Sequence, residues 1–426
     1  MASRSPEIIE IPYGEGFRSI QRDGINLAGL LVPTPTPAAS DPEAAIRHAL
    51  ENPQGGPRLE DMEAGEGGYL ILADDMTRST PVATMIAAIL EEFNAAGVPD
   101  SQVSVLIATG THRPMTDAEV SERFGAELSR RVQIVNHDYR TSRLVDMGET
   151  EHGTPISVNE EALRAGAVIG LGSIVPHHIP GFSGGAKIIQ PGISGDTTTA
   201  ATHLFSALSE VPILGMVDSP VRREMEEVAG RVGLSASLNV TLNAQGELVE
   251  AFFGGPGAVF RAGAAASTRI YGVPARRGVD IVVAGSHPCD IEFWQAHKSL
   301  FPAAQMVRPG GTIVVLTPCP EGVARTHDDV LNYAAKPYDR IEQMITSGAV
   351  EDPVGASNAV AWARIRETAD ISIVSDGITP NDCRALGFRH FASLDDALAD
   401  ARLRLGRDAS VSVMTHAPET LPLFQG

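Results

Sequence analysis

Cysteine is scarce in this sequence. The 426 residues include three, Cys289, Cys319 and Cys383. Their spacing contains no CxxC pair, which excludes a disulfide framework and a thiolate metal site and favours a reducing compartment. Long apolar runs are also absent: no window approaches the roughly 18 uninterrupted apolar residues of a spanning helix, and the first residues lack the apolar segment of a signal peptide. We therefore expect a cytoplasmic protein with no membrane partner.

Positive charge is in deficit. Lys and Arg total 33 against 53 Asp and Glu, which gives a net charge of −20. Such a surface repels phosphates, so a nucleic-acid partner is not expected. Hydrophobic residues at 43% and a mean hydropathy near zero describe a folded globular chain rather than a disordered one. At about 150 residues per domain, the length predicts two or three domains.

Short β-branched runs bounded by turn residues recur along the chain. They are continuously apolar, as in strands buried on both faces of a parallel sheet. Helical stretches alternate with them: Thr80–Pro81 opens a helix over Val82 to Ala96, with Pro81 as its first residue, and Thr116 to Glu119 is a capping box. The predicted strands are Tyr69 to Ala73, Val103 to Ala108, Val132 to Val135, Ala167 to Leu171, Ile281 to Ala284, Thr312 to Leu316 and Ile371 to Val374. This rhythm predicts an α/β fold with mainly parallel sheets.

Turn-rich segments suggest where the domains divide. We predict an N-terminal domain over residues 1–272, a C-terminal α/β domain over 279–415 and a tail over 416–426 that returns to the N-terminal domain. The first 65 or so residues fit the α/β rhythm poorly. They predict one or two antiparallel strands and a helix over Pro42 to Glu51, decorating the first domain. An active-site cleft is expected between the two domains.

Charged side chains follow two of the predicted strands. Asp75 and Arg78 come between a strand and a helix N-terminus, where open α/β sheets bind anions. His112 follows the next strand, at the same edge of the sheet. Arg78 could grip a carboxylate or phosphate, or only pair with an aspartate in a tight turn. A single histidine is more often structural than catalytic, but its place beside Arg78 favours function.

A glycine-rich segment runs from Val175 to Gly195. It is neither a Walker A loop nor a GxGxxG motif, so a generic P-loop is excluded. Its glycines, Gly184 and Gly185 among them, allow a ligand close approach to the backbone. Lys187 in this loop could be a phosphate counter-ion or a nucleophile, and we expect it in a surface loop rather than in a core. Asp196 can then cap a helix that carries His203.

The second domain offers one further polar pair. If Asp290 caps the helix that follows it, Gln295 and Lys298 lie at i and i+3 and share a face. That face would carry an amide and a cation toward the cleft. Without the other segments, a solvated helix surface would be the better interpretation.

Together these segments resemble the nickel-pincer nucleotide lactate racemase family. The resemblance rests on Asp-Met-Thr-Arg-Ser-Thr-Pro at 75–81, Gly-Thr-His-Arg-Pro-Met-Thr at 110–116 and Pro-His-His-Ile-Pro-Gly-Phe-Ser-Gly-Gly-Ala-Lys at 176–187, with His203, Gln295 and Lys298 at matching positions. It covers the chain from about residue 49 into the C-terminal domain. It implies a racemase or epimerase of a 2-hydroxy acid that works by reversible hydride transfer.

The resemblance also implies roles for individual residues. The cofactor would be a pyridinium-3-thioamide-5-thiocarboxylic acid mononucleotide with nickel, attached covalently at Lys187, and made by separate cofactor biosynthesis proteins. His203 would be the nickel ligand, and Asp75, Gly184 and Gly185 would bind the cofactor. His112 and His177 would form the acid/base pair, with His177 chosen over His178 by spacing alone. The residues implied to orient the substrate are Arg78, Gln295 and Lys298.

Two other functions remain open at this point. One is a catalytically silent homologue that binds a nucleotide, which the joint presence of His112, His177, Lys187 and His203 disfavours. The other is a nicotinamide-dependent dehydrogenase, disfavoured because no strand-GxGxxG-helix fingerprint is present.

Overall fold

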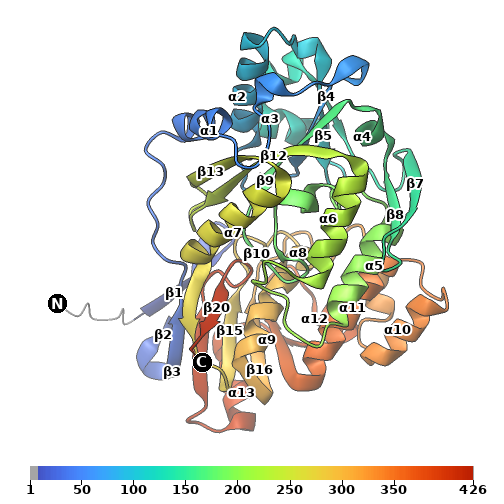
Figure 1. Cartoon of the computed structure of the whole chain (residues 1–426). Helices are drawn as coiled ribbons and strands as arrows, with labels where there is room; N and C mark the ends of the chain where they lie inside the picture. Colours follow the sequence, from blue (N-terminus) through green and yellow to red (C-terminus); the bar gives the residue numbers. More distant parts are fainter. Residues whose placement is uncertain (1–7, 426) are drawn as a thin grey trace. The chain divides into compact units, whose positions relative to one another are not determined.

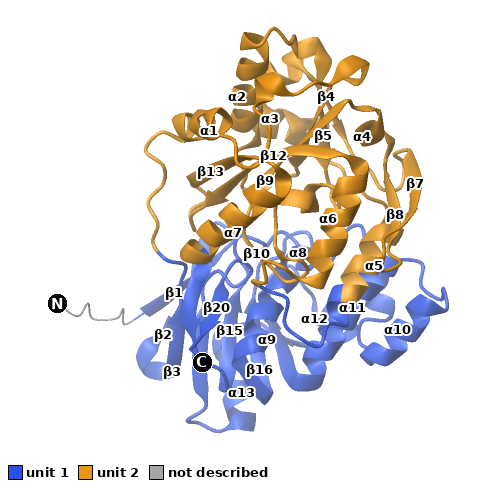
Figure 2. Cartoon of the chain, viewed as in Figure 1, with its two compact units in different colours: residues 1–34, 206–214, 271–426 blue, residues 35–205, 215–270 orange. Residues whose placement is uncertain are grey.

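The computed structural model describes residues 8–425 and divides into two compact units (Figure 2). Unit 1 comprises residues 1–34, 206–214 and 271–426, and unit 2 comprises residues 35–205 and 215–270. Both are α/β structures built on mainly parallel sheets, so the predicted fold class is confirmed.

Unit 2 is built on a six-stranded sheet in the order β13-β12-β9-β4-β5-β6 (Figure 1). Neighbouring strands are parallel except for β12 and β13. The strands are β4 (Tyr69–Asp74), β5 (Val103–Ala108), β6 (Gln133–Asn136), β9 (Ala167–Ser173), β12 (Leu234–Leu242) and β13 (Leu248–Gly254). β9 is buried along its whole length, as its apolar sequence predicts.

Helices and short strand pairs complete unit 2. The helices are α1 (Pro42–Glu51), α2 (Val82–Ala95), α3 (Asp117–Arg131), α4 (Glu160–Arg164), α5 (Asp196–Ala207), α6 (Pro220–Val232) and α7 (Pro256–Tyr271), the last residues of α5 and α7 falling in unit 1. The strand pairs are β7 (Leu144–Glu149) with β8 (Pro155–Asn159) and β10 (Pro176–His177) with β11 (Gly181–Phe182). The Thr116–Glu119 capping box forms as predicted. Pro81, in contrast, is the N-cap of α2 rather than its first residue.

The topology of unit 2 creates one switch point. From β4 the chain builds outward through β5 and β6 on one side, and β9, β12 and β13 fill the other. Ligands of open α/β sheets bind at such a point, outside the carboxyl ends of the strands. The segments with Asp75 and His177 follow β4 and β9, the two strands that meet there.

Unit 1 contains, within the described residues, a second six-stranded sheet in the order β18-β17-β16-β15-β19-β3, parallel throughout. Its strands are β3 (Asn26–Leu31), β15 (Val279–Gly285), β16 (Val307–Leu316), β17 (Ala369–Val374), β18 (Arg389–Phe391) and β19 (Ser410–Met414). Two further pairs are β1 (Ile8–Tyr13) with β2 (Gly16–Gln21) and β14 (Gly272–Ala275) with β20 (Leu421–Phe424). The helices are α8 (Phe293–Ala296), α9 (Leu300–Met306), α10 (Tyr338–Thr346), α11 (Pro353–Thr368), α12 (Pro380–Leu386) and α13 (Leu394–Leu405).

The chain ends are placed differently from the predicted domains. The N-terminal strands do not decorate the first domain: β3 completes the unit 1 sheet beside β19, and Ile9 and Ile11 pack in the unit 1 core. The C-terminal tail does not return to the N-terminal domain, because β20 pairs with β14 inside unit 1. In both cases a strand edge pairs with a strand from a distant part of the chain: β19 with β3, and β14 with β20. The helix over Pro42–Glu51 forms as predicted and belongs to unit 2.

Among the described residues, no helix combines the length and the apolar character needed to cross a bilayer.

Candidate active site

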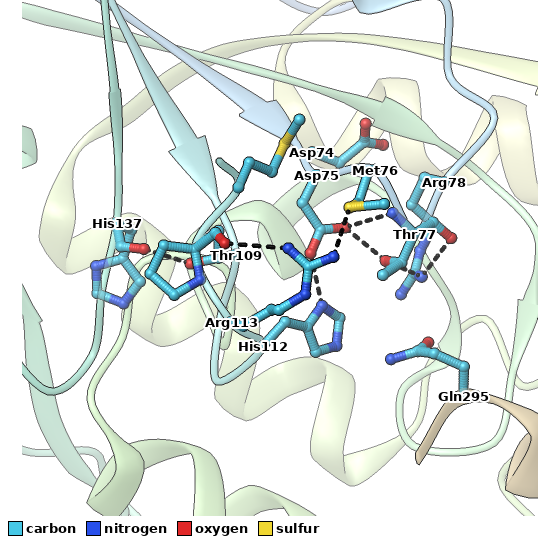
Figure 3. Close-up of polar contacts among 12 residues, drawn as sticks. Asp74, Asp75, Met76, Thr77, Arg78, Thr109, His112, Arg113, His137 and Gln295 are labelled. Atoms are coloured by element: carbon cyan, nitrogen blue, oxygen red, sulfur yellow. Dashed lines mark hydrogen bonds and ion pairs between the residues drawn. The ribbon is translucent and has the colours of Figure 1, made fainter. Parts of the chain in front are cut away.

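The turn after β4 brings Asp75, Thr77 and Arg78 together (Figure 3). The buried Asp75 carboxylate accepts hydrogen bonds from the Thr77 N–H at 3.0 Å and the Thr77 hydroxyl at 2.5 Å. Arg78 donates from Nη1 to the Thr77 carbonyl at 3.0 Å and to the Thr77 Oγ1 at 2.8 Å. Arg78 is half-buried, and these bonds hold its guanidinium close to the strand end.

His112 joins this turn from the end of β5. Its Nδ1 lies 2.6 Å from Asp75 Oδ2 (Figure 3). Burial alone would raise the pKa of Asp75, but the His112 charge and hydrogen bond, with Arg78 and Thr77, hold that pKa well below its ordinary value. The carboxylate therefore stays ionised and accepts the Nδ1 proton of His112, so Nε2 is the ring atom that can exchange a proton with a substrate.

Two arginines that sequence reasoning missed support these loops. Arg123 on α3 pairs with Asp74 at 2.7 Å and donates to the Arg78 carbonyl at 3.0 Å, so it holds the turn from a position 45 residues away. Arg113 binds both carboxylate oxygens of Glu119, at 2.7 and 2.8 Å. The Arg113 hydrogen bond is the main reason that the pKa of Glu119 falls to about 2. The capping box predicted Glu119 as a cap, but no local pattern identifies Arg123.

The glycine-rich segment after β9 is buried, although the sequence predicted a surface loop. Residues 181–190 are all buried except Lys187, which is partly exposed. Gly184 and Gly185 adopt φ values of +76° and +55°. A Cβ on Gly184 would lie 2.5 Å from Ile174, and one on Gly185 would lie 3.1 Å from Phe260. The segment is thus a close-packed cradle from which the Lys187 side chain emerges, because neighbouring elements cover the glycines.

His177 and His178 are both buried in this segment, and their rings stack with centroids 4.8 Å apart. His177 Nδ1 accepts the Ile179 N–H at 3.2 Å. A neutral imidazole that accepts at Nδ1 carries its proton on Nε2. His177 therefore presents an N–H donor at Nε2, whereas the Asp75 hydrogen bond places the His112 proton on Nδ1.

His203 lies on α5, as predicted. Its Nδ1 is 2.8 Å from the Thr199 carbonyl, a contact that requires a proton on Nδ1 and so places the lone pair of a neutral ring on Nε2. The buried Gln190 ties α5 to the glycine-rich segment through hydrogen bonds to the Thr198 carbonyl at 3.1 Å and the Thr202 hydroxyl at 2.7 Å. The Gly110 N–H donates to the Gly192 carbonyl at 2.8 Å and joins the His112 loop to the same segment. Four connected segments of unit 2 thus hold Asp75, Arg78, His112, His177, Lys187 and His203.

Gln295 and Lys298 lie in unit 1, after β15. Lys298 donates to Gln295 Oε1 at 2.5 Å, so the two side chains share a face as predicted. Asp290 does not cap the helix: the N-cap of α8 is Glu292, which makes no side-chain capping bond. Asp290 instead accepts the Gly14 N–H at 3.3 Å, because the N-terminal hairpin packs in this unit.

The unit 1 residue before Gln295 has a partner that the sequence did not reveal. Trp294 stacks on His327 with ring centroids 4.0 Å apart. His327 Nδ1 lies 2.8 Å from Asp352, which also caps α11 through the Gly355 N–H at 2.9 Å. This arrangement fixes the start of the segment that carries Gln295 and Lys298.

His137 is fully buried, and its carbonyl accepts the Thr109 hydroxyl at 2.5 Å beside the His112 loop (Figure 3). Its Nε2 lies 3.1 Å from the Ser194 carbonyl, and its Nδ1 lies 3.0 Å from Asn159 Nδ2. Burial lowers the pKa of His137 to about 4, against the opposing Ser194 hydrogen bond and Asp138 charge. The Asn159 amide cannot turn to accept a second imidazole proton without cost, because its oxygen already caps α4 through the Glu161 N–H.

We expect this histidine to make the fold acid-sensitive. The pKa of His137 is lower in the folded than in the unfolded state. Its contribution to the free energy of unfolding is therefore complete above pH ~6.5 and is lost as the pH falls toward about 4. The free energy of unfolding should therefore drop by about 3 kcal/mol over this window. Denaturant unfolding at pH 7, 5.5 and 4 measures it. His137→Gln, which keeps one acceptor and one donor but does not titrate, should show a shallower pH dependence, and equal slopes would refute this account.

Within residues 8–425, no group of three or more His, Cys, Asp and Glu side chains is arranged to hold a metal ion. A protein-only metal centre is therefore not seen among them.

Comparison with known proteins gives a consistent result. Models of the lactate racemase N-terminal domain and the lactate racemase C-terminal domain match residues 13–212 and 275–418. The chain is 27% identical to a lactate racemase of Lactiplantibacillus plantarum over 95% of this chain and 97% of the relative. It is 28% identical to one from Thermoanaerobacterium thermosaccharolyticum, again over 95% and 97%.

Solved structures agree. The lactate racemase apoprotein from T. thermosaccharolyticum superposes with a TM-score of 0.87 at 26% identity, covering 98% of this chain and 100% of that one. A protein of Thermotoga maritima shares the fold, with a TM-score of 0.71 at 19% identity over 91% and 99% of the two chains.

Proposed function

Because the chain belongs to the lactate racemase family and is an isomerase, we propose that it racemises lactate or a larger 2-hydroxy acid. The reaction inverts the carbon that bears the hydroxyl group: the hydroxyl proton and the hydride on that carbon leave, and the hydride returns to the opposite face. The observation that carries this proposal is the pair of histidines held in opposite tautomers, His112 by Asp75 and His177 by the Ile179 N–H.

The reaction must run in both directions, so each histidine must be able to take and to give a proton. We assign His112 Nε2 as the base that takes the hydroxyl proton from one enantiomer and so becomes an imidazolium. A neutral imidazole N–H is too weak an acid for the second step, so His177 supplies a proton from its imidazolium form and returns to the neutral tautomer that accepts the Ile179 N–H. In the reverse direction the roles exchange, since a turnover leaves His112 protonated and His177 neutral. Asp75, which the resemblance assigned to the cofactor, is assigned here to orient His112, because its carboxylate is engaged by His112 and Thr77.

The substrate carboxylate needs cationic partners. We assign this task to Arg78, whose guanidinium is anchored on Thr77, and to Lys298, whose amine is oriented by Gln295. Two cations neutralise the carboxylate, and an amide can bind the hydroxyl or a carbonyl oxygen. These assignments account for the three substrate-orienting positions that the resemblance implies.

The family implies a nickel-dependent cofactor, and the residues of unit 2 fit one. His203 is arranged to give one nitrogen ligand through Nε2, which suits nickel. Lys187 is the partly exposed residue of the buried segment 181–190, so its side chain can reach a nucleotide bound beside that segment. We propose that Lys187 tethers the nickel-pincer nucleotide, with Gly184 and Gly185 against it, and that cofactor biosynthesis proteins are required partners. When bound, the nucleotide supplies the carbon that takes up and returns the hydride.

Protein that carries the cofactor, called loaded protein below, tests the proposed function directly. Protein co-expressed with the cofactor biosynthesis proteins should interconvert D- and L-lactate or larger 2-hydroxy acids, followed by chiral chromatography, and should contain nickel. Apoprotein from a host that lacks those proteins should fold but show no racemisation. Loaded protein that is inactive on every 2-hydroxy acid tried would favour the catalytically silent homologue. Full activity in the apoprotein would contradict the cofactor assignment.

A further inference from the structure

A buried arginine underlies the glycine-rich segment and has no part in the proposed chemistry. Arg222, on α6, is 1% exposed. It makes none of the ion pairs found within the part of the chain that the structure describes, and its Nε has no hydrogen-bond partner there. Burying a guanidinium without a carboxylate costs several kcal/mol, on the order of the penalty for any uncompensated buried charge. Such a cost suggests that the cation serves another purpose at this position.

The contacts of Arg222 identify what it holds. Nη1 donates to the Gly184 carbonyl at 3.1 Å, and Nη2 donates to the Phe182 carbonyl. The same Gly184 carbonyl also accepts the Lys187 N–H at 3.2 Å, the bond that closes the 3-10 turn on which Lys187 sits. The guanidinium therefore grips the carbonyl on which the Lys187 turn is built.

The other side of the guanidinium is equally constrained. Its carbon lies 3.8 Å from the centre of the Phe260 ring, a cation–π contact from α7. Ser219 caps α6 through the Arg222 N–H at 3.0 Å, and its hydroxyl donates to the Pro180 carbonyl at 3.2 Å. Arg222 is thus clamped between the aromatic ring and the loop backbone, and the loop cannot shift without moving the guanidinium.

The charge is retained despite burial. Burial lowers the pKa of Arg222 to about 9, opposed by the charge of Glu226, so the group is still cationic at pH 7.

We propose that Arg222 is the positioning residue of the Lys187 loop: it fixes the turn that presents the Lys187 amine. The inference rests on the proposed role of Lys187, because a tether forms from a neutral amine. Arg222 touches neither substrate nor cofactor in this account and acts only through Lys187.

The reactivity of the Lys187 amine can be measured site by site, because the chain contains only three lysines, Lys187, Lys298 and Lys336. Full-length apoprotein is treated with limiting acetic anhydride from pH 6 to 10. Each neutral amine forms an N–C bond while acetate leaves and a proton passes to buffer. Peptide mass spectrometry then reports acetylation at Lys187 relative to the exposed Lys336.

Two variants separate charge from geometry. In Arg222→Met, which loses both, the plateau rate of Lys187 acetylation should fall several-fold, because the turn no longer holds the amine in one position. Arg222→Lys keeps the charge but not the two-pronged donor, so its profile should keep its midpoint while the plateau rate falls. The matched control is Arg223→Met: Arg223 is the next residue of α6, is exposed and pairs with Asp218 at 2.7 Å. It should leave the Lys187 profile unchanged.

The outcomes are distinct. If Arg222→Met folds, by circular dichroism and thermal melting, and its Lys187 profile superposes on that of the unchanged protein, the inference is wrong. If Arg222→Met does not fold, the plateau rate of Lys187 acetylation in Arg222→Lys tests the inference instead. A plateau rate equal to that of the unchanged protein overturns the inference. Because acetylation needs no cofactor, this result is independent of whether Lys187 proves to be the tether, which intact mass of the loaded protein reports.

Discussion

Replacing His112 with alanine should lower the racemisation rate in both directions by about 10²- to 10⁴-fold, the usual cost of losing a positioned base. Both directions suffer because each turnover uses one histidine to take the proton and the other to return one. Nickel content should stay unchanged, since His203 rather than His112 is the proposed ligand. Initial rates from pure D- and pure L-substrate, with metal analysis of the same samples, measure the effect.

Asp75→Asn tests the orienting role within the same assay. The amide cannot hold His112 through a charge-assisted bond, which contributes about 1.5 to 3 kcal/mol, so the rate should fall by roughly 10- to 100-fold. His152, an exposed histidine of unit 2, provides the control, and His152→Ala should be fully active. A His112→Ala variant that keeps its rate would contradict the assignment. An inactive His178→Ala beside an active His177→Ala would show that His178 is the acid.

Lys187→Arg should abolish covalent attachment of the cofactor and reduce racemisation to the level of the apoprotein. Arginine keeps the positive charge and much of the length of lysine, but its guanidinium stays protonated at neutral pH and cannot serve as the nucleophile. Intact mass spectrometry of protein made with the cofactor biosynthesis proteins reports attachment, and the racemase assay reports activity. The expected loss is the largest of all the variants considered, because under the proposed mechanism the group that takes up the hydride would be absent.

Lys336→Arg is the matched control, since it makes the same change at an exposed lysine far along the chain. It should retain the added mass and the full rate. A cofactor mass that persists on Lys187→Arg would move the tether to Lys298 or Lys336, and peptide mapping would tell which. Normal activity without any added mass would remove the covalent tether from the mechanism.

Much of the fold could be predicted because its signals are local. A strand buried on both faces must be apolar at every position, which is why β4, β5, β9, β15, β16 and β17 are visible as short β-branched runs. The capping box at Thr116 involves residues three apart. The edge of the unit 2 sheet that bears Asp75 and His112 follows from the same rhythm, since parallel strands align their carboxyl ends.

The supporting contacts could not be predicted because their partners are far apart in sequence. Nothing near Asp74 indicates Arg123, and nothing near Gly184 indicates Arg222 or Asn239, whose side chain accepts the Gly185 N–H at 2.8 Å. The pairing of β3 with β19 joins the two ends of the chain, and a free strand edge does not specify which strand will fill it. Burial of the glycine-rich loop also depends on residues that are distant in sequence. The loop's own residues suit a surface turn, but α6 and α7 cover it.

By itself the sequence determined which side chains follow which strands, and hence that Asp75, Arg78 and His112 gather at one sheet edge. Tertiary structure alone decided their protonation and orientation. The Asp75 carboxylate selects the His112 tautomer, the Ile179 N–H and the Thr199 carbonyl select those of the other two site histidines, and Arg222 grips the Lys187 turn. The physical reason is range: strand and helix patterns arise from neighbours along the chain, whereas the hydrogen bonds that set the state of a buried group depend on whatever the fold packs against it.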